Sequence, residues 1–229
     1  MTARLCRAPI AALAFAVLVF LFGLSAAPAA ANERALSPVS TDSREGRELV
    51  EKLRGGGYVL FFRHADTLGE PCDRSFKVGD RAGQRNISPQ GREQSRRIGE
   101  AIRSLGIPYS TPVLAGPVYR ARDTAELAFG TENVKVTDSL LADDFSGPRL
   151  QWVLGEHRRL FESPVPARTN VMLFGHRTPA IMVLGASVGG RAFPEGAALV
   201  LERQPSGALP RVAGILMLAP IEGGGFHAC

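Results

Sequence analysis

Two apolar segments of the sequence each run into a histidine, and each segment is typical of a buried strand. Residues 58–62 (YVLFF) are followed by Arg63 and His64. Residues 170–174 (NVMLF) precede His176 by one glycine. A buried guanidinium is costly unless it is paired, so a strand that stops at an arginine is expected to open onto a site that uses both groups. In open α/β sheets ligands bind beyond the carboxyl ends of the strands, so both imidazoles would share one crevice if their strands are neighbours.

A third segment brings another arginine to the same edge. Residues 111–115 are a predicted strand, and the following residues 116–120 (GPVYR) place Arg120 at the start of a helix. Helix N-termini and arginine forks both favour phosphate. On spacing alone, Arg120 and Arg122 would be solvated helix residues. In combination with Arg63 and the two histidines, Arg120 predicts a cationic pocket that needs no bound metal.

Such a pocket suits phosphoryl transfer. A neutral imidazole flanked by arginines is a competent nucleophile toward phosphorus, because nearby positive charge disfavours its protonation and the guanidiniums hold the phosphoryl oxygens in line. Phosphoryl transfer depends on positioning and charge stabilisation more than on anything else. We therefore expect a phosphate-handling site with no metal and no other cofactor.

The elements that must position these residues alternate in periodicity along the chain, which is the pattern of an α/β domain with a largely parallel sheet. The expected fold is a three-layer α/β/α sandwich with five or six strands. The last two strands are expected to form a hairpin. Helices are predicted at about 41–54, 88–105, 119–129 and 150–161, and strands at 58–62, 111–115, 170–174, 197–202 and 212–218, with 134–136 as a candidate sixth strand.

The first 31 residues have the features of a secretory signal peptide: a basic start, an apolar stretch over 8–24 and small residues before Asn32. Cleavage is expected after Ala31, which would leave residues 32–229 as one domain in the periplasm or outside the cell. The alternative is a retained membrane anchor, because the apolar stretch is close to the minimum spanning length. In either case the rest of the chain is exported.

The net charge of the chain bears on which partners it binds. The formal net charge of +5 falls to +3 without the two arginines of the leader, which is too weak and scattered to indicate nucleic acid. No feature predicts an oligomeric state, and a membrane partner follows only if the leader is kept as an anchor.

Cys6 lies in the leader, which leaves Cys72 and Cys229 in an oxidising compartment and predicts a disulfide between them. Two free thiols are the alternative, since sequence does not show their separation.

The chemistry-bearing segments resemble motifs of the histidine phosphatase superfamily, also called phosphoglycerate mutase-like. Residues 63–67 (RHADT) look like its RHG/RHA motif, and residues 116–126 (GPVYRARDTAE) are similar to its SPLxRAxxTAE segment. Residues 174–179 (FGHRTP) resemble its later histidine motif, and residues 88–91 (SPQG) are similar to the TPxG start of its first long helix. The resemblance spans about residues 58–218, with the motifs in the family's order.

The resemblance implies that His64 is the nucleophile that becomes transiently phosphorylated. It implies that Arg63, Arg120 and His176 bind the phosphoryl group. Thr67 falls where the family often has a hydroxyl residue near the phosphate.

The resemblance also implies an acid, in a loop after the third strand, that gives a proton to the leaving oxygen. Asp143 is at that position, with Asp144 next to it. Asp143 would be shorter than the glutamate common in the family, so Asp144, or neither residue, is an alternative. Both aspartates could instead be solvated loop residues that cap the following helix.

Four further residues, Arg177, Arg81, Arg85 and Asn86, are candidates for contacting the substrate. Arg177 follows His176 where a small residue is frequent in the family, so it either reaches the substrate or is solvated. Asn86 lies with Arg81 and Arg85 in the long polar segment after the first strand, and long loops at this edge of a sheet often select substrates. The glycine-rich residues 222–229 (EGGGFHAC) lack the lysine and following helix of a phosphate loop, and a flexible tail is expected there.

Together these features predict an exported, metal-independent phosphoric monoester hydrolase that acts on a small phosphorylated substrate through a phosphohistidine. The same fold in this superfamily also supports mutases, and export favours hydrolysis because a glycolytic mutase would lack its substrates there. Two alternatives stay open. One is a catalytically silent module that binds phosphorylated or anionic sugars, and the other is a phosphatase for phosphohistidine in proteins.

Overall fold

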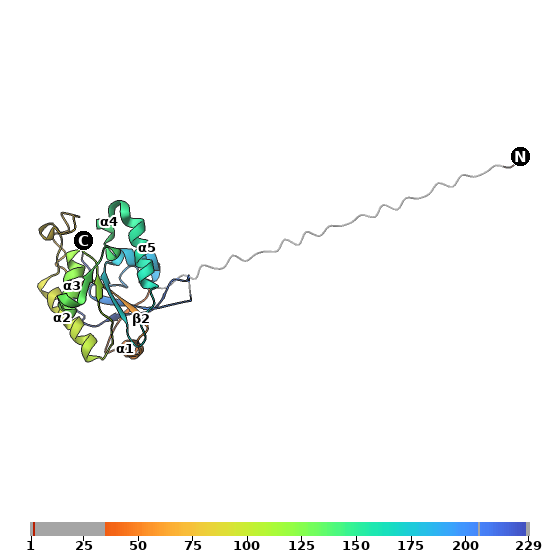
Figure 1. Cartoon of the computed structure of the whole chain (residues 1–229), viewed down its shortest axis with the longest axis horizontal. Helices are drawn as coiled ribbons and strands as arrows, with labels where there is room; N and C mark the ends of the chain where they lie inside the picture. The colour runs from red at the N-terminus through yellow and green to blue at the C-terminus, as the bar shows by residue number, and fades with distance from the viewer. Residues whose placement is uncertain (1, 3–34, 206, 228–229) are drawn as a thin grey trace. The chain divides into compact units, whose positions relative to one another are not determined.

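The computed structural model describes residues 2, 35–205 and 207–227, and the structural statements below concern these residues (Figure 1). Their seven strands form one mixed, mostly parallel sheet with helices packed on both faces. The predicted three-layer α/β/α fold is therefore confirmed. The strands are β1 (Pro38–Ser40), β2 (Tyr58–Arg63), β3 (Val113–Ala115), β4 (Val134–Val136), β5 (Val171–Gly175), β6 (Ala197–Glu202) and β7 (Arg211–Met217).

The helices divide between the two faces of the sheet. Apolar side chains of α1, α2 and α3 pack on one face, and those of α5 and α6 pack on the other. The α-helices are α1 (Arg44–Gly55), α2 (Pro89–Ser104), α3 (Tyr119–Phe129), α4 (Asp143–Ser146), α5 (Leu150–Phe161) and α6 (Arg177–Leu184). Short 3₁₀ helices are η1 (Arg81–Gly83), η2 (Thr131–Asn133), η3 (Asp138–Leu140), η4 (Gly147–Arg149) and η5 (Ala186–Val188).

The strand order β1-β7-β6-β2-β5-β3-β4 places β2 at the centre, beside β5. The two strands are parallel, with Arg63 opposite Gly175. The backbone N–H of His64 donates to the carbonyl of Gly175 at 3.1 Å, which extends the pairing by one residue. The expectation that the two histidine-bearing strands are neighbours is thus confirmed, and so is the antiparallel hairpin of β6 and β7.

Alternating residues of β2 build both halves of the core. Phe62 stacks on Phe174 with ring centroids 4.5 Å apart on the α1–α3 face, and Phe61 meets Phe161 edge-on at 5.0 Å on the α5 face. All four side chains are fully buried. Burying one such ring contributes about 1.5–3 kcal/mol, so packing on both faces stabilises the strand that leads to His64.

Helix α2 is tied to the end of β2 through its N-cap. The hydroxyl of Ser88 accepts from the N–H of Gly91 at 2.8 Å and donates to the carboxylate of Asp66 at 2.6 Å. Helix α3 lacks a side-chain cap of its own, and the side-chain oxygen of Gln84 accepts from the N–H of Tyr119 at 3.1 Å instead. The long polar loop after β2 is therefore fastened to the helix start that carries the predicted phosphate arginine.

Strand β1, helices α4 and α6, and the short 3₁₀ helices were not predicted, and the sheet has seven strands where five or six were expected. Helix α4 is a single turn in a segment that was expected to be a loop. Strand β1 has three residues and begins with a proline, which leaves no alternation to recognise in an edge strand. Helix α6 (RTPAIMVL) carries a proline and a run of apolar residues, so it shows no amphipathic period.

Part of the sequence-based interpretation lies outside the described residues. This holds for the expected signal peptide at 1–31, its cleavage after Ala31, and the Cys72–Cys229 disulfide, since Cys229 is not described. All three stay predictions. Among the described residues, no helix has the length and apolar character that crossing a membrane requires.

Candidate active site

The residues that follow β2, β5 and β3 surround one cavity of about 290 Å³. Eight of the candidate residues named from the sequence line it, and Thr67, Arg81 and Asn86 do not. The eight are Arg63, His64, Arg85, Arg120, Asp143, Asp144, His176 and Arg177.

The His64 imidazole is held as a neutral base. Its Nδ1 lies 2.9 Å from the carbonyl oxygen of Ala65, which can only accept, so Nδ1 carries the proton and Nε2 keeps a free lone pair. Burial lowers the pKa of His64 well below its usual value, and the charges of Arg63 and Arg120 lower it further. The ring centroid of His176 is 5.4 Å away. The side chain therefore has the tautomer and charge of a nucleophile.

The Arg63 guanidinium is fixed by three partners. Its Nη1 donates to the carbonyls of Phe193 at 3.0 Å and Gly225 at 3.3 Å, and its Nη2 donates to Glu195 at 3.1 Å. Burial lowers the pKa of Arg63 to about 10, so it is charged at neutral pH. Its Nε is buried and has no partner among the described residues.

Two more arginines have the same arrangement. Arg120, which is 4% exposed, binds Asp73 through Nη1 at 3.0 and 3.1 Å, and its buried Nε has no partner in the described part of the chain. Arg85 comes no closer than 4.0 Å to Glu195, and its buried Nε and Nη1 are likewise without partners there. Arg85 was only a loop candidate in the sequence, and the structure brings it into the cavity wall.

Six of the buried side-chain nitrogens that lack a partner among the described residues belong to side chains that line one cavity. They are Nε of Arg63, Nε and Nη1 of Arg85, Nε of Arg120, Nε of Arg177, and Nε2 of His176. The seventh, Nε2 of His157, lies in the apolar core. A buried charged donor that is left unsatisfied costs more than about 1–3 kcal/mol, so a protein keeps several together only where something else supplies the acceptors. An anion with several oxygens would satisfy them, and the lone pair of His64 lies in the same wall.

The two aspartates form the start of the short helix α4. Asp143 is partly buried and Asp144 is exposed. Burial, and then the charge of Asp144, raise the pKa of Asp143 above its usual value. A raised pKa favours the protonated form, which is what a proton donor to a leaving group requires.

Thr67 and Asn86 have structural partners outside the cavity. The N–H and hydroxyl of Thr67 donate to the Glu195 carboxylate at 3.1 and 3.2 Å. The side-chain amide of Asn86 donates to the carbonyls of Arg81 at 3.0 Å and Gln84 at 2.7 Å, within its own loop. The loop thus presents Arg85 to the cavity in place of its neighbour Asn86.

The sequence did not single out Glu195, although it is fully buried and binds Arg63 and Thr67. The available signal was a lone acid inside the apolar run AFPEGAALVL, which is expensive unless the acid is paired. His227, from the glycine-rich end of the chain, also lines the cavity. Nothing in the sequence places that residue beside the others, because the contact joins segments far apart in the chain.

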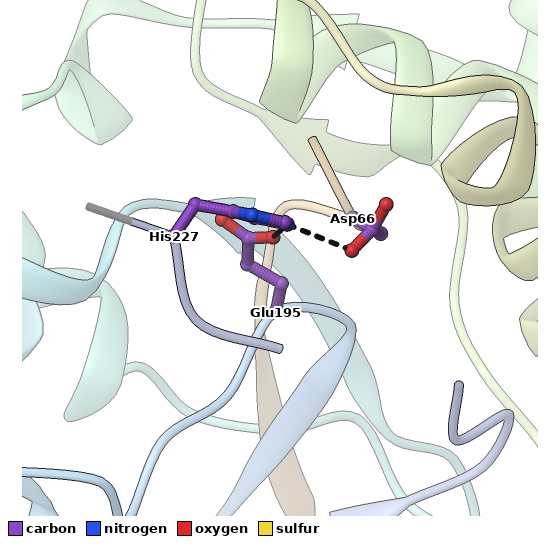
Figure 2. A group of neighbouring side chains, drawn as sticks. All are labelled: Asp66, Glu195 and His227. Atoms are coloured by element: carbon purple, nitrogen blue, oxygen red, sulfur yellow. Dashed lines mark hydrogen bonds and ion pairs between the residues drawn. The ribbon is translucent and has the colours of Figure 1, made fainter. Parts of the chain in front are cut away.

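Asp66, Glu195 and His227 are the group among the described residues that could hold a metal ion (Figure 2). Figure 2 shows the His227 ring edge directed at both carboxylates. The His227 Nε2 lies 3.0 Å from Asp66 and 3.4 Å from Glu195. Glu195 already faces Arg63 at 3.1 Å and Arg85 at 4.0 Å, and two guanidiniums this close disfavour a further cation. We therefore treat the group as a hydrogen-bonded cluster.

No family model matches the chain, and no curated protein matches it. Among solved structures, the protein histidine phosphatase SixA complexed with tungstate is 16% identical, with a TM-score of 0.46 over 70% of this chain and 97% of that one. A phosphoglycerate mutase from Thermus thermophilus is 19% identical, with a TM-score of 0.41 over 68% and 96%. Phosphoserine phosphatase from Entamoeba histolytica, in complex with 3-phosphoglyceric acid, is 13% identical, with a TM-score of 0.45 over 69% and 95%.

Proposed function

We propose that the protein is a phosphatase that hydrolyses phosphate monoesters through a phosphohistidine on His64. The observation that carries the proposal is the set of buried, unpartnered donors of Arg63, Arg85, Arg120 and His176 around a neutral imidazole. A phosphoryl group supplies the oxygens that these donors lack, and its phosphorus is the electrophile for the His64 lone pair.

In the first step, Nε2 of His64 attacks phosphorus and the ester P–O bond breaks. The guanidiniums stabilise the charge on the phosphoryl oxygens, while the Nδ1–H bond to the Ala65 carbonyl holds the ring and stabilises the positive charge that develops on it. Asp143 gives its proton to the leaving oxygen, which departs as an alcohol.

In the second step, the Asp143 carboxylate accepts a proton from water as the water oxygen attacks the phosphorus. The P–N bond breaks, inorganic phosphate leaves, and both His64 and Asp143 return to their starting states. The raised pKa of Asp143 supports its assignment over Asp144, because it must be protonated at the start of each cycle.

Export and metal independence belong to the same proposal. The signal-like residues 1–31 support action in the periplasm or outside the cell. The arginines supply the positive charge that a metal would otherwise bring to the phosphoryl group. Hydrolysis rather than transfer follows if the substrate is met outside the cytoplasm.

The test is hydrolysis of 4-nitrophenyl phosphate and of a panel of phosphate esters, including a phosphohistidine peptide, in excess chelator. Turnover that persists with chelator, is lost in His64→Ala and passes through an acid-labile phosphoenzyme supports the proposal. Phosphate binding without turnover of any ester would refute it in favour of a silent binding module.

A further inference from the structure

The chain returns to the cavity after β7, and one of its carbonyls reaches Arg63. The Gly225 oxygen accepts from Nη1 of Arg63 at 3.3 Å and from the backbone N–H of Glu195 at 2.9 Å. Since both N–H groups of Nη1 and one of Nη2 are used by Phe193, Gly225 and Glu195, the donors of Arg63 left for an oxyanion are the unpartnered Nε and the second N–H of Nη2. The orientation of the guanidinium thus depends partly on residue 225.

The next residue packs against three guanidiniums. The Phe226 ring centroid lies 5.3 Å from the guanidinium carbon of Arg63, 5.8 Å from that of Arg177 and 4.7 Å from that of Arg191. These distances are within the range of cation–π attraction. An aromatic face at this place attracts all three guanidiniums and leaves their positive charge in place. A carboxylate at the same place would neutralise part of that charge.

His227 fastens the segment to the end of β2. Its Nε2 lies 3.0 Å from Asp66 and 3.4 Å from Glu195, and about 25% of its side chain is exposed (Figure 2). Glu195 is in turn the carboxylate partner of Arg63. The histidine therefore restrains the same acid that restrains the arginine.

The close approach of the segment needs a glycine at residue 225. Its φ of 103° is in the region that side chains rarely adopt, and a Cβ there would lie 2.9 Å from the Cβ of Pro194. Gly223 also has a positive φ, of 68°, but a Cβ there would meet nothing within 4 Å. The backbone is thus fitted to its neighbours at residue 225 and not at residue 223.

We propose that residues 225–227 are a positioning segment of the phosphate site, in which Gly225 and Phe226 orient the Arg63 guanidinium and His227 anchors them to Asp66 and Glu195. The proposal rests on the proposed function, because it takes the cavity to bind a phosphoryl group. It adds three residues to that function. They do not touch the reacting atoms, but they orient Arg63, which does.

The experiment measures the affinity for inorganic phosphate by calorimetry, and kcat and KM for 4-nitrophenyl phosphate, in the full protein. We expect Phe226→Leu and His227→Leu each to weaken phosphate binding and raise KM by about tenfold or more. In each variant the Arg63 guanidinium would no longer point at the phosphate, so the charged hydrogen bond between them is lost. His227→Gln should restore part of the affinity, since its amide can still donate to one carboxylate.

Two control variants separate positioning from general damage. Trp152→Leu removes a comparable cation–π contact, with Arg149 at 5.8 Å, and should leave phosphate affinity unchanged. Gly225→Ala should weaken phosphate binding, while Gly223→Ala, which also has a positive φ, should not. Thermal unfolding of each variant shows whether it is folded at the temperature of the binding measurement.

The outcomes are distinguishable. If the wild type binds phosphate and both leucine variants bind it equally well, the positioning role is refuted and the proposed function stands. If the folded wild type binds no phosphate, the proposed function fails and the positioning role fails with it.

Discussion

Buried histidines occur in two regions of the molecule. His64 and His176 line the cavity, whereas His157 lies on α5 in the apolar core. In both regions burial lowers the pKa of the imidazole. The local hydrogen bonds also match, because Nδ1 of His157 lies 2.9 Å from the Val153 carbonyl, as Nδ1 of His64 does from that of Ala65.

The surroundings of the free ring nitrogen differ. His157 meets the rings of Phe61 and Phe161 with centroids 5.9 and 5.8 Å away, and its Nε2 is buried without a partner among the described residues. The neighbours of His64 include the charges of Arg63 and Arg120. A buried neutral imidazole is therefore no sign of catalysis by itself, and the unsatisfied cations around it make the difference.

The strongest way to break this comparison is to remove each histidine in turn. We expect His64→Ala to lose at least about 10³-fold in kcat, because no other group can carry the phosphoryl intermediate. His157→Leu should change kcat by less than a few-fold, since the Val153 carbonyl it contacts already has a helical partner. Steady-state assays of both folded variants check this, and a similar loss in the two would show that the core histidine also serves the reaction.

The sequence predicted the fold well because the buried strands are long and uniformly apolar. Segments 58–62 and 170–174 have the uniformly apolar pattern of buried strands. Because the two strands are parallel neighbours, the histidines that follow them lie at one edge of the sheet. The sequence also predicted Arg63 and Arg120 in the cavity wall, because Arg63 ends β2 and Arg120 lies in the first turn of α3, the helix that follows β3. Such residues are placed by a strand or by the start of the helix that follows it.

The sequence could not predict the partners that reach the cavity through loops. Arg85 rather than Asn86 faces the cavity because of how the loop after β2 is fastened, and no local pattern encodes that choice. Glu195 and His227 meet across long sequence separations. The ion pairs and hydrogen bonds of Glu195 and His227 form only in the folded chain. Those of Glu195 also hold the Arg63 guanidinium in place.

The proposed proton donor, Asp143, is a second feature that the cavity has and the surroundings of His157 lack. Asp143→Asn should lower kcat by roughly 10²- to 10³-fold for an alkyl phosphate, whose leaving oxygen needs a proton. The loss should be much smaller for 4-nitrophenyl phosphate, whose leaving group departs as a stable anion. Asp144→Asn is the matched control, and a larger effect in that variant would transfer the role of acid to Asp144.

A smaller effect should follow from removing one of the cations that distinguish the two regions. Arg120→Met is expected to weaken phosphate binding roughly ten- to hundredfold. Since the charge of Arg120 lowers the pKa of His64, its loss should raise that pKa and move the acid limb of the kcat/KM profile to higher pH. The control is Arg81→Met, because Arg81 binds Asp123 away from the cavity. An acid limb that does not move in Arg120→Met would contradict the electrostatic account.

The smallest expected effect concerns stability and uses what the two regions share. A histidine whose pKa is lowered in the folded protein binds fewer protons there than in the unfolded chain, where its pKa is about 6.5. Its contribution to stability is therefore fully present above about pH 6.5 and is lost as the pH falls below that value. Each such histidine adds at most about 1.4 kcal/mol of lost stability per pH unit.

His157→Leu should consequently flatten the pH dependence of the free energy of unfolding between about pH 7 and 5. His64 keeps its share of the slope in the variant, because burial, Arg63 and Arg120 lower its pKa without His157. His157 helps to lower the pKa of His176, so its loss reduces the share of His176 and flattens the slope in the same direction. Asp143, with its raised pKa, contributes with the opposite sign in both proteins and cancels from the difference. Urea unfolding at several pH values measures the slope. Equal slopes in wild type and variant would mean that His157 is not held neutral by the core, and the likeness between the two regions would not hold.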